Sequence, residues 1–259
     1  MTFTVPARLT LLALASLAST AALAQVKTDG LWRGVGGAAL AMTSGNSNST
    51  AVSLNADMVR ATTADKITFG ANSNYARSKT SGVTSTTANK WSGFGQYDYN
   101  LSSQLFAFGK LGLEGDQLTD LALRSSLAGG LGYKLIDTKE TSFNIFGGAA
   151  YTVDQYDATK TIGSKTAKRF SRASIYLGEE SSHTLSASTS FKQRLELYPG
   201  ISGDKAVLAK FTAGLGVAIS STLNLSVGLV DTYNSKPPAG SKKNDVGLFT
   251  GINVKFGAM

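Results

Sequence analysis

The chain contains one histidine, His183, which directly follows Ser181 and Ser182. A serine hydrolase needs an imidazole that a third group, usually a carboxylate, orients beside the serine hydroxyl. We expect these three residues in a short turn, where neighbours in sequence rarely reach that geometry. The sequence therefore favours a protein that is not an enzyme, and a hydrolase that uses His183 is the alternative.

Two other patterns resemble catalytic or nucleotide-binding motifs. Glu114 and Asp116 are two residues apart, so on a strand they share one face, as the paired acids of general acid–base catalysis do. We expect them instead to pair with Arg124, which returns on the next strand. The glycine runs at 34–37 and 129–132 do not open a helix, so they predict no phosphate-binding loop. With one histidine and no cysteine, the sequence predicts no metal site and no cofactor.

The elements that carry these residues are strands. Between residues 52 and 58, apolar side chains at even positions alternate with polar side chains at odd positions, and this period of two is typical of a strand with two different faces. The pattern recurs to the C-terminus in twelve segments. Their approximate spans are 31–43, 50–60, 66–78, 90–101, 105–115, 121–136, 142–155, 171–179, 185–198, 206–219, 223–233 and 245–256.

These segments predict a membrane barrel. A tilted strand crosses a bilayer in about 9–11 residues, and bacterial barrels have an even number of strands. Every second connection is short, such as 61–65 and 220–222, whereas 79–89 and 156–170 on the other side are long, which places both termini in the periplasm. The sequence therefore predicts an all-β, antiparallel transmembrane barrel of about 12 strands in the outer membrane. A soluble sandwich or lipocalin-like barrel is the alternative, with its apolar face inside.

Aromatic residues on the apolar face gather near the segment ends. Such rings mark the two membrane–water interfaces of a barrel as aromatic girdles. The expected girdle residues are Trp32, Tyr75, Trp91, Tyr99, Tyr133, Tyr151, Tyr233 and Phe256.

Residues 1–24 have the features of a signal peptide. Arg8 supplies the positive start, residues 9–17 form an apolar run too short to span a bilayer as a helix, and Ala22-Leu23-Ala24 fits the small-residue cleavage rule. We expect cleavage before Gln25 and a single barrel domain over residues 25–259. An uncleaved anchor helix is the alternative.

If the apolar face meets lipid, the polar face lines the lumen. Nine basic and eight acidic residues fall on that face, and this near balance predicts ion pairs rather than a wall of one sign. We expect Arg124 or Arg172 to reach Glu114 or Glu196, and separately solvated charges are the alternative. The network assigned from sequence is Asp98, Glu114, Arg124, Arg172, Lys192, Arg194 and Glu196, with Arg33, Asp57, Lys110, Asp116, Lys134, Asp154, Glu180, Lys210, Asp245 and Lys255 also on the lumen face.

The long loops carry an excess of lysine, and phosphate-bearing lipopolysaccharide would attract such a ring. We therefore expect outer-membrane lipid and lipopolysaccharide as partners, together with the barrel-assembly machinery, and small solutes if the lumen is open. Aromatic side chains are not interleaved with the loop lysines, so nucleic acid is not an expected partner.

Several short motifs resemble the salt-induced outer-membrane proteins, the YdiY-like family. The matching residues are Trp32 with Thr-Ser-Gly-Asn-Ser at 43–47, Arg124 followed by Gly-x-Gly-Tyr at 130–133, and Asp-x-Tyr-x-Ser-x-Pro-Pro at 231–238 before a last strand that ends at Phe256. The resemblance implies a barrel associated with salt or acid stress and brings no catalytic residues. The chain departs from the usual aromatic C-terminus by ending in Gly-Ala-Met, so Phe256 would have to serve in that position. Asp231 also departs from the pattern, because alternation points it toward lipid unless it lies above the hydrocarbon or at a bulge.

The sequence thus leads to two functions for the barrel. The first is a non-enzymatic protein, structural or with a narrow pore, that supports the envelope under salt or osmotic stress. The second is a narrow diffusion channel for small charged solutes.

Overall fold

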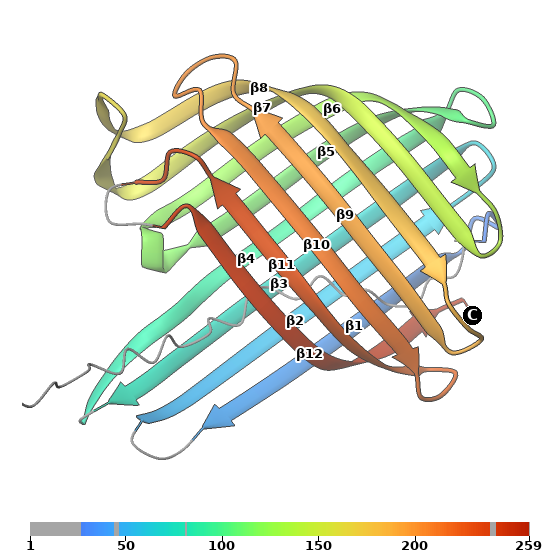
Figure 1. Ribbon diagram of the computed structural model, residues 1–259, viewed down its shortest axis with the longest axis horizontal. Helices are drawn as coiled ribbons and strands as arrows, with labels where there is room; N and C mark the ends of the chain where they lie inside the picture. Colours follow the sequence, from blue (N-terminus) through green and yellow to red (C-terminus); the bar gives the residue numbers. More distant parts are fainter. Residues whose placement is uncertain (1–26, 44–46, 81, 239–241, 259) are drawn as a thin grey trace, which may run out of the picture.

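The computed structural model describes residues 27–43, 47–80, 82–238 and 242–258 as one closed barrel of twelve antiparallel strands (Figure 1). This confirms the predicted fold class. The expected signal peptide, residues 1–24, lies outside the described residues. The strands are β1 Trp32–Thr43, β2 Ser47–Ala61, β3 Asp65–Thr80, β4 Val83–Asn100, β5 Leu105–Asp116, β6 Leu121–Asp137, β7 Thr141–Ile162, β8 Lys165–Thr184, β9 Thr189–Pro199, β10 Val207–Ala218, β11 Leu223–Asn234 and β12 Asn244–Gly257.

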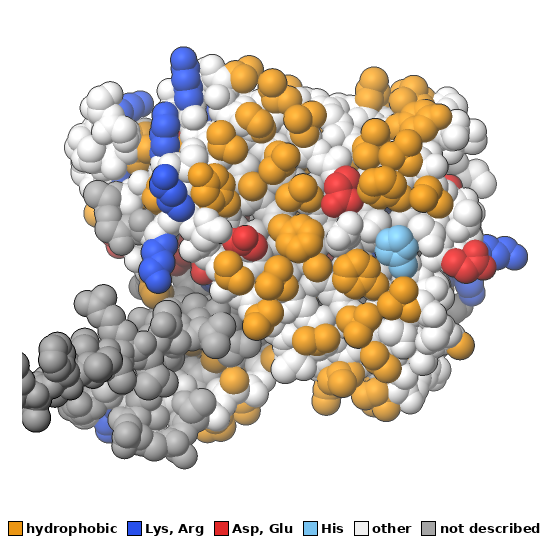
Figure 2. All heavy atoms as spheres, viewed as in Figure 1, with side chains coloured by type: hydrophobic (Ala, Val, Ile, Leu, Met, Phe, Trp, Pro, Cys, Tyr) orange, Lys and Arg blue, Asp and Glu red, His pale blue; other side chains and the backbone are white. Residues whose placement is uncertain are grey.

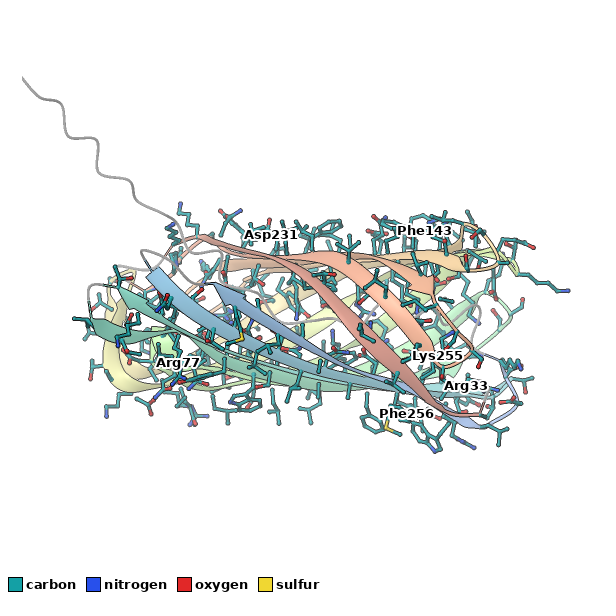
Figure 3. The ribbon with its side chains drawn as sticks, turned by 90° about the horizontal axis from the view of Figure 1, so that it is seen from below. Arg33, Arg77, Phe143, Asp231, Lys255 and Phe256 are labelled. Atoms are coloured by element: carbon teal, nitrogen blue, oxygen red, sulfur yellow. The ribbon has the colours of Figure 1, made fainter. Side chains whose placement is uncertain are left out.

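The barrel closes where β1 pairs with β12. The register runs from Arg33 opposite Gly257 to Ala38 opposite Ile252, and each other strand pairs with its neighbours in sequence. No strand edge is therefore left to pair with another chain. The barrel is thinner along the viewing direction of Figure 1 than across it. The turned view of Figure 3 shows Arg33 and Phe256 at one end of the barrel and Arg77 toward the other end.

The apolar face of the strands points outward. Leu40 and Leu127 are 66% and 61% exposed, whereas inward-facing Val35 and Asn74 are at most 1% exposed. Figure 2 shows apolar side chains over the middle of one outer face and basic side chains gathered toward one end. A large apolar outer surface of this kind needs lipid around it, which rules out the soluble alternative. The protein is a transmembrane barrel of the outer membrane.

Two predicted long loops are largely strand. β3 and β4 continue to the pair Thr80–Val83, and β7 and β8 continue to the pair Ile162–Lys165. Only short turns remain where the sequence suggested loops 79–89 and 156–170. These hairpins project beyond the apolar band, so their outward side chains are mostly polar and the alternation that marks the other strands fades there. On β7 and β8, the apolar side chains of Tyr156, Ile162 and Phe170 pack in a buried cluster instead.

Several of the predicted girdle residues are exposed on the outer wall. Trp32 stacks on Phe69 of the neighbouring hairpin with ring centroids 6.0 Å apart, close to the chain termini. Tyr75 and Trp91 are also exposed, with Trp91 near the middle of β4 and Tyr75 paired with Asn89 two residues from it. Trp32 and Phe69 thus form an aromatic pair at the end of the wall near the termini, and a second girdle at the other end stays a prediction.

Two acidic residues also face outward. Asp231 pairs with Phe211 on β10 and Val246 on β12 with no shift in register, so the suggested bulge is absent there. Asp231 lies three residues before the end of β11, near the girdle residue Tyr233. Glu179 on β8 occupies the same register row, two strands away from Phe211. Among the described residues, the helical structure is the single turn Gln117–Thr119, so no helix there is long enough to cross a bilayer.

Candidate functional site in the barrel lumen

A cluster of polar side chains crosses the lumen and is called the lumen bar below. Alternation along each strand turns these residues inward, because their sequence neighbours lie on the outward face. The lumen bar consists of Lys66, Gln96, Asp98, Lys110, Tyr176, Glu180, Arg194 and Glu196.

Three contacts of the lumen bar join distant strands. Lys110 Nζ on β5 lies 2.5 Å from Glu196 Oε1 on β9. Arg194 Nη2 on β9 donates to Gln96 Oε1 on β4 at 3.2 Å. Lys66 on β3 and Glu180 on β8 form a weaker pair at 3.8 Å. In a ring of twelve strands these partners are four or five strands apart, so the contacts span the interior rather than follow the wall.

The other contacts of the lumen bar run between neighbouring strands. Lys66 pairs with Asp98 at 3.0 Å, and Arg194 pairs with Glu180 at 2.5 Å. Within β9 itself, Arg194 also pairs with Glu196 at 3.1 Å. Tyr176 also donates a hydrogen bond to Glu196. Glu196 thus accepts from a lysine, an arginine and a tyrosine, which offsets the cost of holding a carboxylate away from water.

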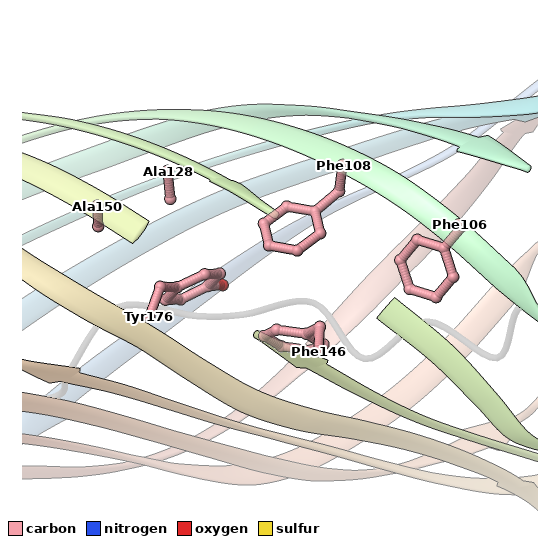
Figure 4. Close-up of a cluster of buried hydrophobic side chains, with 6 residues drawn as sticks. All are labelled: Phe106, Phe108, Ala128, Phe146, Ala150 and Tyr176. Atoms are coloured by element: carbon pink, nitrogen blue, oxygen red, sulfur yellow. The ribbon is translucent and has the colours of Figure 1, made fainter. Parts of the chain in front are cut away.

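Aromatic rings fill the interior beside the lumen bar (Figure 4). Phe108, Phe146 and Tyr176 form a mutually contacting cluster with centroids 5.4 to 5.8 Å apart. Tyr198 packs on Tyr176 at 4.8 Å, and the Arg194 guanidinium lies 4.9 Å from the centre of the Phe146 ring. Rings in this position exclude water from one side of the charged groups and raise the strength of their pairing.

Sequence reasoning missed most of this aromatic cluster. Phe106 and Phe108 share the strand face of Lys110, and Phe146 shares that of Asp154, so the alternation that placed the charges inward could have placed the rings inward as well. The lumen face predicted from sequence contained charged residues alone. Gly132 makes room for Phe106, since an added Cβ at this position would overlap the ring.

A second network follows the inner wall of the outer half of the barrel. Arg124 lies 2.5 Å from Glu114 and 2.6 Å from Asp154. Arg172, which is 2% exposed, lies 3.3 Å from Asp154 and 2.9 Å from Asp204. The charges alternate in sign along this chain of contacts, so each guanidinium lies between two carboxylates.

The residues assigned from sequence separate into these two networks. The structure brings Arg124 to Glu114, whereas Arg172 contacts Asp154 and Asp204 rather than Glu196. Asp98, Arg194 and Glu196 belong to the lumen bar, and Lys192 lies within the electrostatic influence of Asp57 and Glu180. Lys66 was missed, although alternation with Ile67 and Phe69 indicates its inward direction. Asp204 stands in the loop between β9 and β10, where no alternation exists to reveal it.

Two connected cavities lie on the outer side of the lumen bar and together are called the vestibule. One, of about 190 Å³, reaches Lys242 and Lys243 at the mouth. The other, of about 130 Å³, reaches Lys110 and Glu196 of the lumen bar. Both are lined by Lys210, together with Ser92, Glu114, Arg124, Thr232 and Asn234. The lumen bar therefore forms the floor of a recess that faces the outside.

His183 lies in β8 rather than in a turn, because β8 continues to Thr184 and the turn follows it. Its Nε2 is 3.2 Å from Ser181 Oγ, and its Nδ1 is 3.4 Å from Thr141 Oγ1 on β7. The ring stacks on Phe191 with centroids 6.2 Å apart. The group that orients the imidazole is thus a hydroxyl rather than a carboxylate. In the part of the chain that the structure describes, no cluster of three or more His, Cys, Asp or Glu could hold a metal ion.

One family model, described as a protein of unknown function, DUF481, matches residues 36–256. No protein of curated function matches the sequence. Among solved structures, the NanC porin is 10% identical, with 86% of this chain and 97% of that chain covered and a TM-score of 0.45.

Two further structures are similar in the same degree. The COG4313 outer membrane channel from Pseudomonas putida F1 is 12% identical, with 88% and 96% of the two chains covered and a TM-score of 0.48. The translocator domain of the autotransporter NalP from Neisseria meningitidis is 13% identical, with 91% and 90% covered and a TM-score of 0.42. The likeness is to outer-membrane barrels in general and carries no information about a solute.

Proposed function

The chain belongs to the DUF481 family of proteins of unknown function, and we propose that it is a non-enzymatic outer-membrane barrel closed at rest by the lumen bar. The observation that carries this proposal is the set of contacts that join β3, β4 and β5 to β8 and β9 through the interior. An open diffusion channel would need its wall charges to stay on the wall and leave the axis to water.

The closure would be sensitive to salt. Lys66, Glu180 and Arg194 are each between 25% and 33% exposed at the side chain, so dissolved ions can reach them. Screening weakens such partly wetted pairs more than the buried contact between Lys110 and Glu196. The resemblance to salt-induced barrels and this partial exposure together support a role in the envelope under salt or osmotic stress.

Planar-bilayer recordings test the closure. We expect the purified mature protein to give no stable conductance steps at moderate salt. The double variant Lys110→Ala/Glu196→Ala removes both charges of the shortest cross-lumen pair together and should give ion-passing steps. The matched control Lys90→Ala/Asp245→Ala removes an ion pair of similar length, 2.7 Å, at the mouth and should stay silent.

Stable steps from the unaltered protein would overturn the closed-barrel proposal. So would silence from a Lys110→Ala/Glu196→Ala barrel whose folding is verified by its shifted mobility on unheated gels. The second candidate function, a narrow diffusion channel for small charged solutes, is favoured by one observation, the vestibule that enters the lumen from the outside. Conductance in the unaltered protein would support that function.

The two ends of the barrel support two proposed partners, lipopolysaccharide and the barrel-assembly machinery. Lysines of the outer hairpins and loops, including Lys165 and Lys168, fit the phosphates of lipopolysaccharide. At the periplasmic end, Phe256 packs over Gly34 of β1 and is 42% exposed toward lipid, which suits recognition of the last strand by the assembly machinery. Neither end carries a proposed role for nucleic acid or a cofactor.

A further inference from the structure

The vestibule is a space in the described part of the barrel where positive charges are left over after pairing. Its acidic residues are all engaged. Glu114 pairs with Arg124 at 2.5 Å, and Asp245 pairs with Lys90 at 2.7 Å. Asp116 accepts a hydrogen bond from the backbone N–H of Leu118 at 3.0 Å and caps the short helix there.

Three lysines of the vestibule have no such partner. Lys210, Lys242 and Lys243 form no ion pair with any residue that the structure describes. Lys210 projects from β10 into the lumen, is only partly exposed and lines both cavities. Lys242 and Lys243 lie at the mouth, so the unpaired charges mark the inner and outer parts of the same recess.

An unpaired ammonium group inside a narrow recess is held at a cost that a bound anion would offset. Walls of low polarity also concentrate the field of such charges and raise the local concentration of anions. Pro237, Pro238 and Tyr156 add apolar surface to the same recess. A ligand with acidic groups on a small carbon skeleton would therefore satisfy both parts of its lining.

We propose that the vestibule is a binding site for a small organic anion with two or more acidic groups, such as a polycarboxylate or a sugar phosphate. Lys210 is its inner ligand, and Lys242 and Lys243 are its outer ligands. The inference goes beyond closure of the barrel, because an anion can occupy the outer recess whether or not ions pass the lumen bar.

Isothermal titration of citrate into the detergent-solubilised mature protein at low salt tests this site. We expect saturable binding that weakens as salt is added, because the attraction is between charges. Lys210→Gln should weaken citrate binding about tenfold, since one charge-assisted hydrogen bond is lost. Lys242→Gln/Lys243→Gln should weaken it less, because these side chains lie in more water.

Lys134→Gln is the matched control. Lys134 also lies on the inward side of the wall and lacks an ion pair with the described residues, but it stands near the periplasmic end of β6 and outside both cavities. Its loss should leave citrate affinity unchanged. Absence of saturable citrate binding would overturn the proposal. Equal weakening of citrate binding by Lys134→Gln and Lys210→Gln would also overturn it, because citrate would then be attracted to the net charge of the barrel. Conductance by the unaltered protein would contradict the proposed closure of the lumen, but it would not affect the citrate-binding test.

Discussion

Replacing Glu196 by glutamine should destabilise the barrel strongly, because it leaves two cations of the lumen bar without their shared carboxylate. Lys110 and Arg194 lie 2.5 and 3.1 Å from Glu196 Oε1. At an effective dielectric constant of about 20, these separations correspond to gross attractions of about 7 and 5 kcal/mol. Desolvation and the remaining Arg194–Glu180 pair reduce the net effect, and breaking a buried pair on one side costs about 3–5 kcal/mol. Because the glutamine side chain still accepts a hydrogen bond from one donor, we expect the free energy of unfolding to fall by about 3 kcal/mol, near the lower end of this range.

The assay is reversible denaturant unfolding in lipid vesicles, followed by the fluorescence of the two outward tryptophans, Trp32 and Trp91. Asp245→Asn is the matched control. It makes the same chemical change in a pair of similar length, but the Asp245 side chain is 53% exposed against 7% for Glu196. An exposed pair contributes at most about 1 kcal/mol. Equal losses in the two variants would refute the reasoning, because burial would then not control the contribution of the pair.

Three further outcomes are expected. Gly148→Ala should lower the free energy of unfolding, because an added Cβ at Gly148 would overlap the backbone of β6. Gly109→Ala should leave it unchanged, because nothing lies within 4 Å of a Cβ added there. Equal denaturant midpoints for the two variants would contradict this prediction. The hydrogen bonds from Arg33, at 2.8 and 2.5 Å, hold the pKa of Asp29 well below its usual value. Because the folded-state pKa is lowered, these hydrogen bonds should stabilise the fold fully above about pH 4, the ordinary Asp pKa, and lose that effect only in stronger acid. An NMR titration of the Asp29 carboxyl carbon with a midpoint near 4 would contradict this expectation. His183→Ala should leave any esterase activity of the preparation toward phospholipid vesicles unchanged, and loss of that activity would instead support a hydrolase.

The alternation of side chains was sufficient to predict most of the fold. The outward direction of Leu127 and Leu131 and the inward direction of Arg124 follow from one rule about strand faces, and the structure agrees at each of these positions. Strand ends were harder to predict. Where the wall leaves the bilayer, as at residues 79–80 and 157–161, the side chains are mostly polar on both faces and the rule loses its signal.

The partners of the lumen charges were beyond the reach of the sequence. A pair such as Lys110 and Glu196 is 86 residues apart and depends on the register of every strand between β5 and β9. Alternation indicates which face a residue occupies and not its height in the barrel. For neighbouring strands the height follows from a short turn, and for this reason Arg124 and Glu114 could be expected to meet.

The two halves of the lumen differ in what their charges can do. In the lumen bar, carboxylates and cations lie between aromatic rings and satisfy one another, so an added ion would gain little there and would have to break existing pairs. In the vestibule, the carboxylates are already engaged while Lys210 is unpaired among the described residues, so an anion would gain a partner without displacing one. A solute that entered from outside would therefore be held above the lumen bar rather than passed through it. Binding at the mouth and closure of the lumen are for this reason expected together in the resting barrel, and salt would weaken both.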